Sequence, residues 1–235
     1  MEAQTVGMAR TQYPGAEKFL PPSTELAELA DAARTCHGCN LYEDATQVVF
    51  GVGAPGARVL MVGEQPGDIE DERGVPFVGP AGKLLDRVLH AAGVERDAAY
   101  VTNAVKHFRW KATAGSTRRI HAKPDAAHVS ACRPWLSAEI IAVQPELVVA
   151  LGATAAQSLL GPKFRVTEDR GVLLDWPPAD GWFAGWTCAP SVRHALATIH
   201  PSAVLRGDPA ERAAMFDALV ADLHVVALAL DPGAS

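Results

Sequence analysis

The chain has 235 residues, of which 49% are hydrophobic and 20% are charged, and its formal net charge is −6. This composition can supply a full apolar core, which excludes wholesale disorder, and the acidic balance argues against a protein that coats nucleic acid non-specifically. No apolar run is expected to span a bilayer and no signal-peptide pattern is visible, so we expect a cytoplasmic or nucleoid-associated monomer without a membrane partner. We expect one domain over 23–235, preceded by a loosely ordered lead-in over 1–22.

Predicted strands and helices alternate along the chain. Strands are expected near 58–63, 98–103, 147–151 and 195–199. Helices are expected near 24–35, 80–92, 125–143, 153–160 and 209–230. Pro134 should kink the third of these helices or lie in its first turns, and the Pro-, Gly- and Trp-rich segment 175–193 should be irregular or a short hairpin. This order predicts the α/β class, with a mostly parallel central sheet flanked by helices on both faces.

The segment from Gly63 to Asp86, GEQPGDIEDERGVPFVGPAGKLLD, joins the first predicted strand to a helix. It is rich in glycine, proline and acidic residues, and it lies where an open α/β sheet places its ligand. Two more loops follow predicted strands and begin at Asn103 and His200. Because the carboxyl ends of parallel strands share one edge, the three loops are expected to converge on one crevice.

Cys36 and Cys39 form a CxxC pair, which is compatible with a zinc half-site, a redox pair or an iron–sulfur half-site. The remaining cysteines are Cys132 and Cys188. The small thioredoxin-like context of a redox pair is missing, and a structural disulfide is not expected in a reducing compartment. The residues alone leave zinc and iron–sulfur chemistry open.

A run of cationic side chains without an acidic one follows the second predicted strand. It comprises Lys106, Arg109, Lys111, Arg118, Arg119 and Lys123. Taken alone, such a run is most simply a solvated basic loop, and contact with nucleic acid is the alternative.

Four motifs together resemble the iron–sulfur uracil-DNA glycosylases. They are GE-x-PG…ED-x-x-G-x-PFVG-x-AG from Gly63, TN-x-VK from Thr102, AC-x-PWL from Ala131 and HPS-x-x-x-R from His200. The resemblance extends from about Cys36 to Arg206. It implies the three-layer fold of these enzymes and excision of uracil from DNA, with single-stranded DNA favoured and free uracil as the product.

The resemblance also implies roles for individual residues. Glu64, His121 and His200 are the expected catalytic residues, and Gln65, Gly67, Phe77, Asn103, Arg118, Arg119 and Ser202 are expected to contact the substrate. The amide of Asn103 can pair with uracil, and an imidazole N–H of His200 can stabilise charge on the departing base. Glu64 can stabilise an oxocarbenium-like sugar. The alternatives are that Asn103 caps a helix or a turn and that Phe77 belongs to the core.

For the cysteines, the resemblance implies a [4Fe–4S] cluster. Its expected ligands are Cys36, Cys39, His107 and Cys132, where His107 takes a position that is a cysteine in the family pattern. An imidazole can ligate iron in a cluster. The alternatives are that Cys188 or an outside group replaces His107, and that zinc occupies the site.

Arg118-Arg119-Ile120-His121 resembles the KRIH loop of the UdgX branch, whose members become covalently joined to DNA. Gln65 and His107 match the same branch. This implies that His121 captures C1′ before water does. The alternatives are a phosphate contact by His121 in an ordinary turnover glycosylase, a non-catalytic iron–sulfur protein that binds damaged DNA, and a nucleotide-binding protein, which the loop motif disfavours. The histidines without such context, His37, His90, His128, His194 and His224, are expected at the surface or in structural roles.

Overall fold

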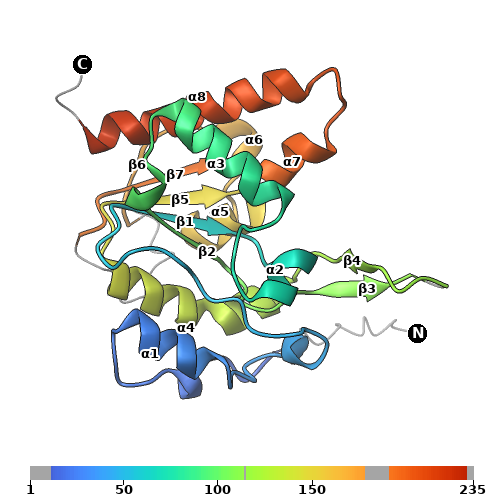
Figure 1. The fold of residues 1–235 in the computed structure, drawn as a ribbon. Helices are drawn as coiled ribbons and strands as arrows, with labels where there is room; N and C mark the ends of the chain where they lie inside the picture. The colour runs from blue at the N-terminus through green and yellow to red at the C-terminus, as the bar shows by residue number, and fades with distance from the viewer. Residues whose placement is uncertain (1–11, 114, 178–190, 232–235) are drawn as a thin grey trace, which may run out of the picture.

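The computed structural model describes residues 12–113, 115–177 and 191–231. Its main sheet has the order β2-β1-β5-β7-β6 (Figure 1). The strands are β1 Val59–Gly63, β2 Ala99–Asn103, β5 Leu147–Leu151, β6 Leu174–Asp175 and β7 His194–Thr198. The first four in the order run parallel, with Gly63 beside Asn103 and Leu151 beside Thr198, and only β6 is antiparallel. The predicted strands are confirmed to within a residue at each end.

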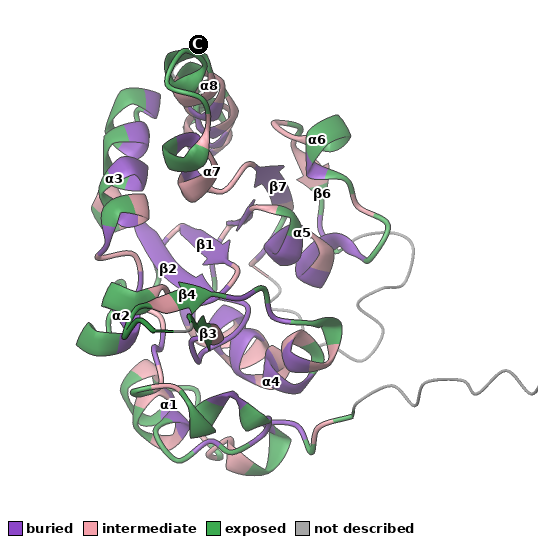
Figure 2. Cartoon of the chain, turned by 90° about the vertical axis from the view of Figure 1, so that its right-hand side faces the viewer, coloured by how far each residue is buried: buried purple, intermediate pink, exposed green. Residues whose placement is uncertain are grey.

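Helices cover the sheet on both faces because the central strands are apolar on both sides. Every residue of β1, β2 and β5 is buried, and Figure 2 shows this for β1 and β2. Leu60 and Val62 of β1 pack toward α4 Ala126–Val143 and α5 Ala153–Leu160, and Val59 and Met61 pack toward α3 Pro80–Ala92 and α8 Arg212–Leu230. The α/β class and the two-sided cover are therefore confirmed.

A further layer lies beyond α4 and contains α1 Leu26–Ala33 (Figure 1). Its apolar cluster also includes Cys36, Cys39 and Cys132. Part of the N-terminal lead-in belongs to this layer. Ala16 is fully buried and its N–H donates to Ala131 O over 2.9 Å, while the ring of Tyr13 lies 4.8 Å from that of His128. These contacts place Tyr13 and Ala16 against α4, and residues 1–11 lie outside the described part of the chain.

Several short elements were not predicted. They are the helices α2 Asp68–Arg73, α6 Val166–Asp169 and α7 Pro201–Arg206, the strands β3 Trp110–Ala112, β4 Arg119–His121 and β6 Leu174–Asp175, and the 3-10 turns Glu17–Phe19, Asn40–Glu43 and Arg96–Ala98. The strands β3 and β4 pair antiparallel, so the predicted basic loop is a hairpin, which projects from the sheet beside α2 (Figure 1). We call residues 110–121 the basic hairpin.

The structure bears on three expectations about longer segments. Pro134 lies in the interior of α4, beyond its first turns, and of the segment 175–193 only the parts outside 178–190 are described. Among the described residues, α8 alone is long and apolar enough to cross a membrane by length and composition, so the expectation that no apolar run reaches this length is wrong. In this fold α8 packs on the sheet through Leu219, Leu223 and Val226.

Candidate active site

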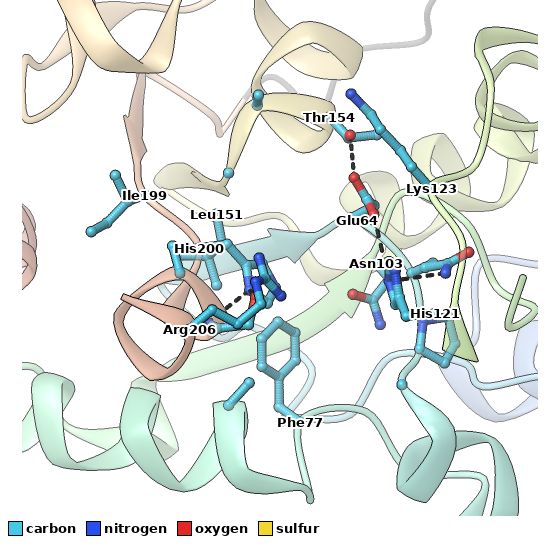
Figure 3. A pocket seen from close by; sticks show the side chains of 18 of the residues that line it. Glu64, Phe77, Asn103, His121, Lys123, Leu151, Thr154, Ile199, His200 and Arg206 are labelled. Carbon is cyan, nitrogen blue, oxygen red and sulfur yellow. Dashed lines mark hydrogen bonds and ion pairs between the residues drawn. The ribbon is translucent and has the colours of Figure 1, made fainter. Parts of the chain in front are cut away.

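A cavity of about 450 Å³ lies at the carboxyl ends of β1, β2, β5 and β7. Its walls include Glu64 after β1, Asn103 at the end of β2, Thr154 after β5 and His200 after β7 (Figure 3). The three predicted loops therefore do converge, as parallel strand order requires. We call this cavity the base pocket.

Close backbone packing shapes the floor of the base pocket. A Cβ atom on Gly63 would lie 2.4 Å from Asn103 Oδ1 and 2.8 Å from the ring of Phe77, so only glycine lets these two side chains meet there. Phe77 itself has φ +56°, an uncommon conformation for a side-chain-bearing residue. Gly82 of α3 lies directly against the Phe77 carbonyl and has no room for a side chain. The ring of Phe77 faces the pocket and lies 6.0 Å from the His200 ring in a stacked orientation.

Asn103 is 2% exposed and lines the base pocket from the last position of β2. The chain beyond it is tied to the β1 loop, because Ala104 N donates to Gly63 O over 2.9 Å and Val105 N donates to Glu64 O over 3.0 Å. The side chain of Asn103 therefore keeps a fixed place beside Glu64. This position is that of a pocket-lining amide rather than a helix cap.

His200 is the N-cap of α7, and this role sets its tautomer. The backbone N–H of Ser202 donates to His200 Nδ1 over 3.1 Å, so Nδ1 is unprotonated. Burial, with help from Arg206 and His121, lowers the pKa of His200 from 6.5 to about 4. The ring is therefore neutral at physiological pH and carries its proton on Nε2. A neutral imidazole of this kind donates one N–H.

Glu64 lies between two partners in the pocket (Figure 3). The hydroxyl of Thr154 donates to Glu64 Oε2, and Glu64 Oε1 lies 3.6 Å from Nε2 of His121. His121 is at the end of β4 with its side chain 48% exposed, and burial lowers its pKa below 6.5 despite the opposing effect of Glu64. The structure thus brings Glu64, His121 and His200 together, as the sequence predicted.

Gln65 joins the β1 loop to the base of the basic hairpin. Its Oε1 accepts from Arg109 N over 3.0 Å, and its Nε2 donates to the carbonyls of Arg109 and Ala122, each over 3.1 Å. The same nitrogen lies 3.0 Å from His121 Nε2. Gln65 is therefore a clamp on the hairpin as well as a residue of the pocket wall.

The sequence suggested that Arg119 contacts the substrate, but in the structure its guanidinium is bound by acidic side chains of α2. Its guanidinium lies 2.5 Å from Asp68 Oδ1 and 2.5 Å from Asp71 Oδ2, and it also donates to Thr46 Oγ1 over 3.0 Å. Asp71 is fully buried. Arg119 therefore fastens the basic hairpin to α2, whereas Arg118 is exposed near the hairpin tip. The sequence suggested the same role for both because they are adjacent arginines. Successive side chains of an extended chain point to opposite sides, so the two have different surroundings.

Lys106, which the sequence grouped with the cations of the basic run, does not lie on the surface with them. Its side chain is 1% exposed and pairs with Glu139 of α4 inside the protein. It is thus a core residue rather than a surface cation. His128 has the structural role expected of it, because it completes a capping box with Asp125 at the start of α4.

The three described cysteines, Cys36, Cys39 and Cys132, are buried free thiols. Two N–H groups point at their sulfur atoms: Trp135 Nε1 donates to Cys36 Sγ over 3.2 Å, and Lys106 N donates to Cys132 Sγ over 3.3 Å. Burial raises the pKa of the Cys132 thiol to about 12. Buried thiols with N–H donors to sulfur match the surroundings that tune iron–sulfur clusters.

His107 is buried beside this layer, and burial lowers its pKa to about 4, against the opposing effect of Asp71. Its ring is neutral and can offer a lone pair to a metal. His37, within the CxxC segment, also affects its pKa. Across residues 12–113, 115–177 and 191–231, no group of three or more His, Cys, Asp and Glu side chains is placed to hold a metal ion. Cys188 lies outside the described residues.

Sequence reasoning gave no place in the base pocket to several residues that line it, although Lys123 and Arg206 belong to motifs noted above. These residues are Glu70 of α2, Lys123 after the hairpin, Thr154 of α5 and Arg206 of α7. The signal for Thr154 was present, because 147–151 was a predicted parallel strand and the loop after such a strand ends at the same sheet edge. Gly67 and Ser202 line the pocket as predicted.

Comparison with known proteins gives a consistent result. The family model for the uracil DNA glycosylase superfamily matches residues 50–224. The chain is 35% identical to the type-4 uracil-DNA glycosylase of Thermotoga maritima over 184 residues, covering 77% of this chain and 84% of that protein. The type-4 enzyme of Sulfurisphaera tokodaii is 34% identical over 156 residues, covering 64% and 67%. That of Pyrobaculum aerophilum is 33% identical over 182 residues, covering 77% and 85%.

Proposed function

The chain belongs to the uracil-DNA glycosylase superfamily, and from this premise we propose that it excises uracil from DNA and that His121 then bonds to the sugar carbon left behind. Uracil excision is the activity of a type-4 uracil-DNA glycosylase, the kind of protein that this chain resembles over most of its length. The bond to His121 goes beyond that activity and is what the resemblance of residues 118–121 to the UdgX branch implies. The observation that supports it is the position of His121, which lines the base pocket and whose Nε2 lies 3.6 Å from Glu64 Oε1.

Recognition of the base uses the floor of the base pocket. A flipped uracil stacks on Phe77, and the buried amide of Asn103 pairs with its Watson–Crick edge. Cytosine presents the opposite donor and acceptor pattern to a fixed amide, so it would leave buried polar groups unpaired. Backbone around Gln65 and Gly67 completes the wall. Arg118, Lys111 and Lys123 are the cations that we assign to the phosphates.

Bond cleavage follows from the protonation states. The bond between C1′ and the base breaks, and its electron pair leaves with uracil as an anion. The Nε2–H of neutral His200 donates to uracil O2 and stabilises that charge. The carboxylate of Glu64, oriented by Thr154, stabilises the positive charge that develops at C1′.

Capture requires a neutral imidazole with a free lone pair beside C1′. The lowered pKa of His121 supplies the neutral ring. Its Nε2 lone pair forms the bond to C1′, and the resulting imidazolium faces Glu64. A proton from solvent neutralises the uracil anion. An alkylated imidazole is a poor leaving group, so the adduct persists.

Water is the competing nucleophile, and turnover with water is the second candidate function. The similarity to type-4 uracil-DNA glycosylases supports it. A denaturing gel of the protein incubated with uracil-containing single-stranded DNA separates the two. Capture predicts a slow band that survives heat and detergent, whereas turnover predicts abasic DNA in molar excess over protein. Unaltered DNA would refute both and leave a binding protein.

The matched variants are His121→Ser and His90→Ser, since His90 is an exposed histidine of α3. Capture predicts that His121→Ser abolishes the slow band but still releases uracil, while His90→Ser behaves as the unmodified protein. A full crosslink with His121→Ser would identify another nucleophile. Repeating the assay with duplex DNA tests the preference for single strands.

For the cysteine layer we propose a [4Fe–4S] cluster bound by Cys36, Cys39, Cys132 and His107. The support is three buried thiols, N–H donors to two of their sulfurs and a neutral buried imidazole. When bound, the cluster would hold the segment after β2 to α4 and the CxxC. Iron and sulfide analysis with visible absorbance tests this, and His107→Ala should lower the iron content while His107→Cys restores it. A colourless protein with stoichiometric zinc would refute the cluster.

A further inference from the structure

The polar network behind Asn103 is made by a buried ion pair. Lys106 and Glu139 are 1% and 0% exposed, and the Lys106 ammonium contacts Glu139 Oε2. Lys106 Nζ also donates to Thr102 Oγ1 over 2.6 Å and to the Asn103 carbonyl over 2.8 Å. The three N–H bonds of the ammonium thus reach three acceptors.

The carboxylate oxygens of Glu139 also have hydrogen-bond donors. Its carboxylate accepts from Tyr100 Oη over 3.1 Å, from Thr102 Oγ1 over 2.9 Å and from Gly51 N over 3.0 Å. These donors lie on β2 and on the chain that bridges to it. A network with every member satisfied is rigid, and burying it costs desolvation energy that simple apolar packing would not. Because the desolvation cost makes a buried ion pair a weak source of stability, we look for a functional role of the Lys106–Glu139 pair.

The network acts on the base pocket through one bond. Lys106 Nζ holds the carbonyl of Asn103, whose side chain faces the pocket, and Lys106 N is held by Cys132 Sγ on α4. Neither Lys106 nor Glu139 lines the pocket. Two hydrogen bonds therefore fix the backbone at Asn103. Lys106 Nζ donates to the Asn103 carbonyl, and the N–H of the next residue, Ala104, donates to Gly63 O at the end of β1.

We infer that the Lys106–Glu139 pair is a positioning device that sets the Asn103 amide against the Watson–Crick edge of the base. The inference rests on the proposed function, because it assigns base recognition to Asn103. A displacement of about 1 Å at a positioned group can cost roughly a hundredfold in rate. Loss of the pair is therefore expected to weaken uracil binding and to slow excision in a protein that remains folded.

The test uses the double variant Lys106→Met/Glu139→Gln. It leaves no buried charge unpaired, and the glutamine oxygen still accepts from Gly51 N and the tyrosine hydroxyl, so the fold is retained. The matched control is Arg58→Met/Glu146→Gln. That pair lies at the amino edge of the same sheet, with Arg58 Nε 2.6 Å from Glu146 Oε1. Glu139→Gln alone keeps the lysine donor to Asn103 but leaves a buried ammonium without its carboxylate, so its uracil affinity is compared only after its melting temperature shows that it is folded.

The measurements are free-uracil affinity by competition, the single-turnover rate of uracil release, iron content and melting temperature. We expect the first double variant to bind uracil at least about tenfold more weakly and to release it about ten to a hundredfold more slowly, with iron content unchanged. Glu139→Gln should lie between it and the control. Unchanged uracil affinity, or loss of iron together with affinity, would overturn the positioning role. If the unmodified protein releases no uracil, the proposed function itself fails.

Discussion

Replacing Arg119 with methionine tests whether the basic hairpin must be held against α2 for His121 to work. Arg119 contacts Asp68 and the fully buried Asp71. Breaking a buried ion pair costs about 3–5 kcal/mol of stability. The expected cost is smaller in this variant, because Asp71 still accepts a hydrogen bond from Thr46 N. A remaining loss of about 2 kcal/mol lowers the fraction of closed hairpin by up to about thirtyfold.

The substitution should separate excision from capture. Glu64 and His200 lie on loops of the main sheet and Asn103 ends β2, so none of them is on the hairpin and uracil release should fall much less than crosslinking. The assay measures both from one reaction, as free uracil and as the heat-stable band. The control is Arg118→Met, which removes a cation from the same hairpin but leaves the contacts to α2. Equal losses of crosslinking in the two variants would refute the anchoring argument and indicate a general charge effect.

The other predictions concern the walls of the base pocket. Gly63→Ala should reduce excision by about a hundredfold, because its Cβ would lie 2.4 Å from Asn103 Oδ1; single-turnover kinetics on a correctly melting protein checks this. Thr154→Val should slow excision about tenfold by removing the hydroxyl donor to Glu64, and an unchanged rate would contradict that role. As the pH falls, the rate of excision should show no loss attributable to His200 near 6.5 and should decline near 4, because burial keeps the imidazole in its working neutral form. Between pH 6.5 and 4 the free energy of unfolding should also fall with falling pH, because the unfolded imidazole takes up its proton before the folded one does.

The sequence predicted the main sheet and most of the long helices because their signals are local. Val59 to Val62 is an unbroken apolar run, and such a run is what a strand buried on both faces requires. The short elements had no comparable signal. Every residue of Asp68–Arg73 except Ile69 is charged, and the helix is supported by Gly74, which ends it in a left-handed conformation, and by the contact of Asp71 with Arg119.

The same limit applies to the site. His200 and Asn103 could be found because each follows a predicted strand, and strand ends converge in a parallel sheet. Lys106 could not be placed, because its burial depends on Glu139 of α4 at a distance of 33 positions along the chain. Arg119 was misplaced for the same reason, since its acid partners belong to α2. A charged residue is assigned to the surface by default, and only its tertiary partner reverses that assignment.

The contest between capture and turnover depends on one nitrogen atom, Nε2 of His121. Gln65 Nε2 lies 3.0 Å from it and can only donate, whereas Glu64 Oε1 lies 3.6 Å away and can only accept. The closer contact favours an unprotonated Nε2, which is the nitrogen that must attack C1′. Gln65 has two amide hydrogens for three acceptors, because it also faces the carbonyls of Arg109 and Ala122. When C1′ takes the lone pair, Gln65 keeps both carbonyl bonds, so the nucleophile is released without an unpaired donor. A lone pair held on Nε2 of His121 beside Glu64 is the physical reason to expect capture.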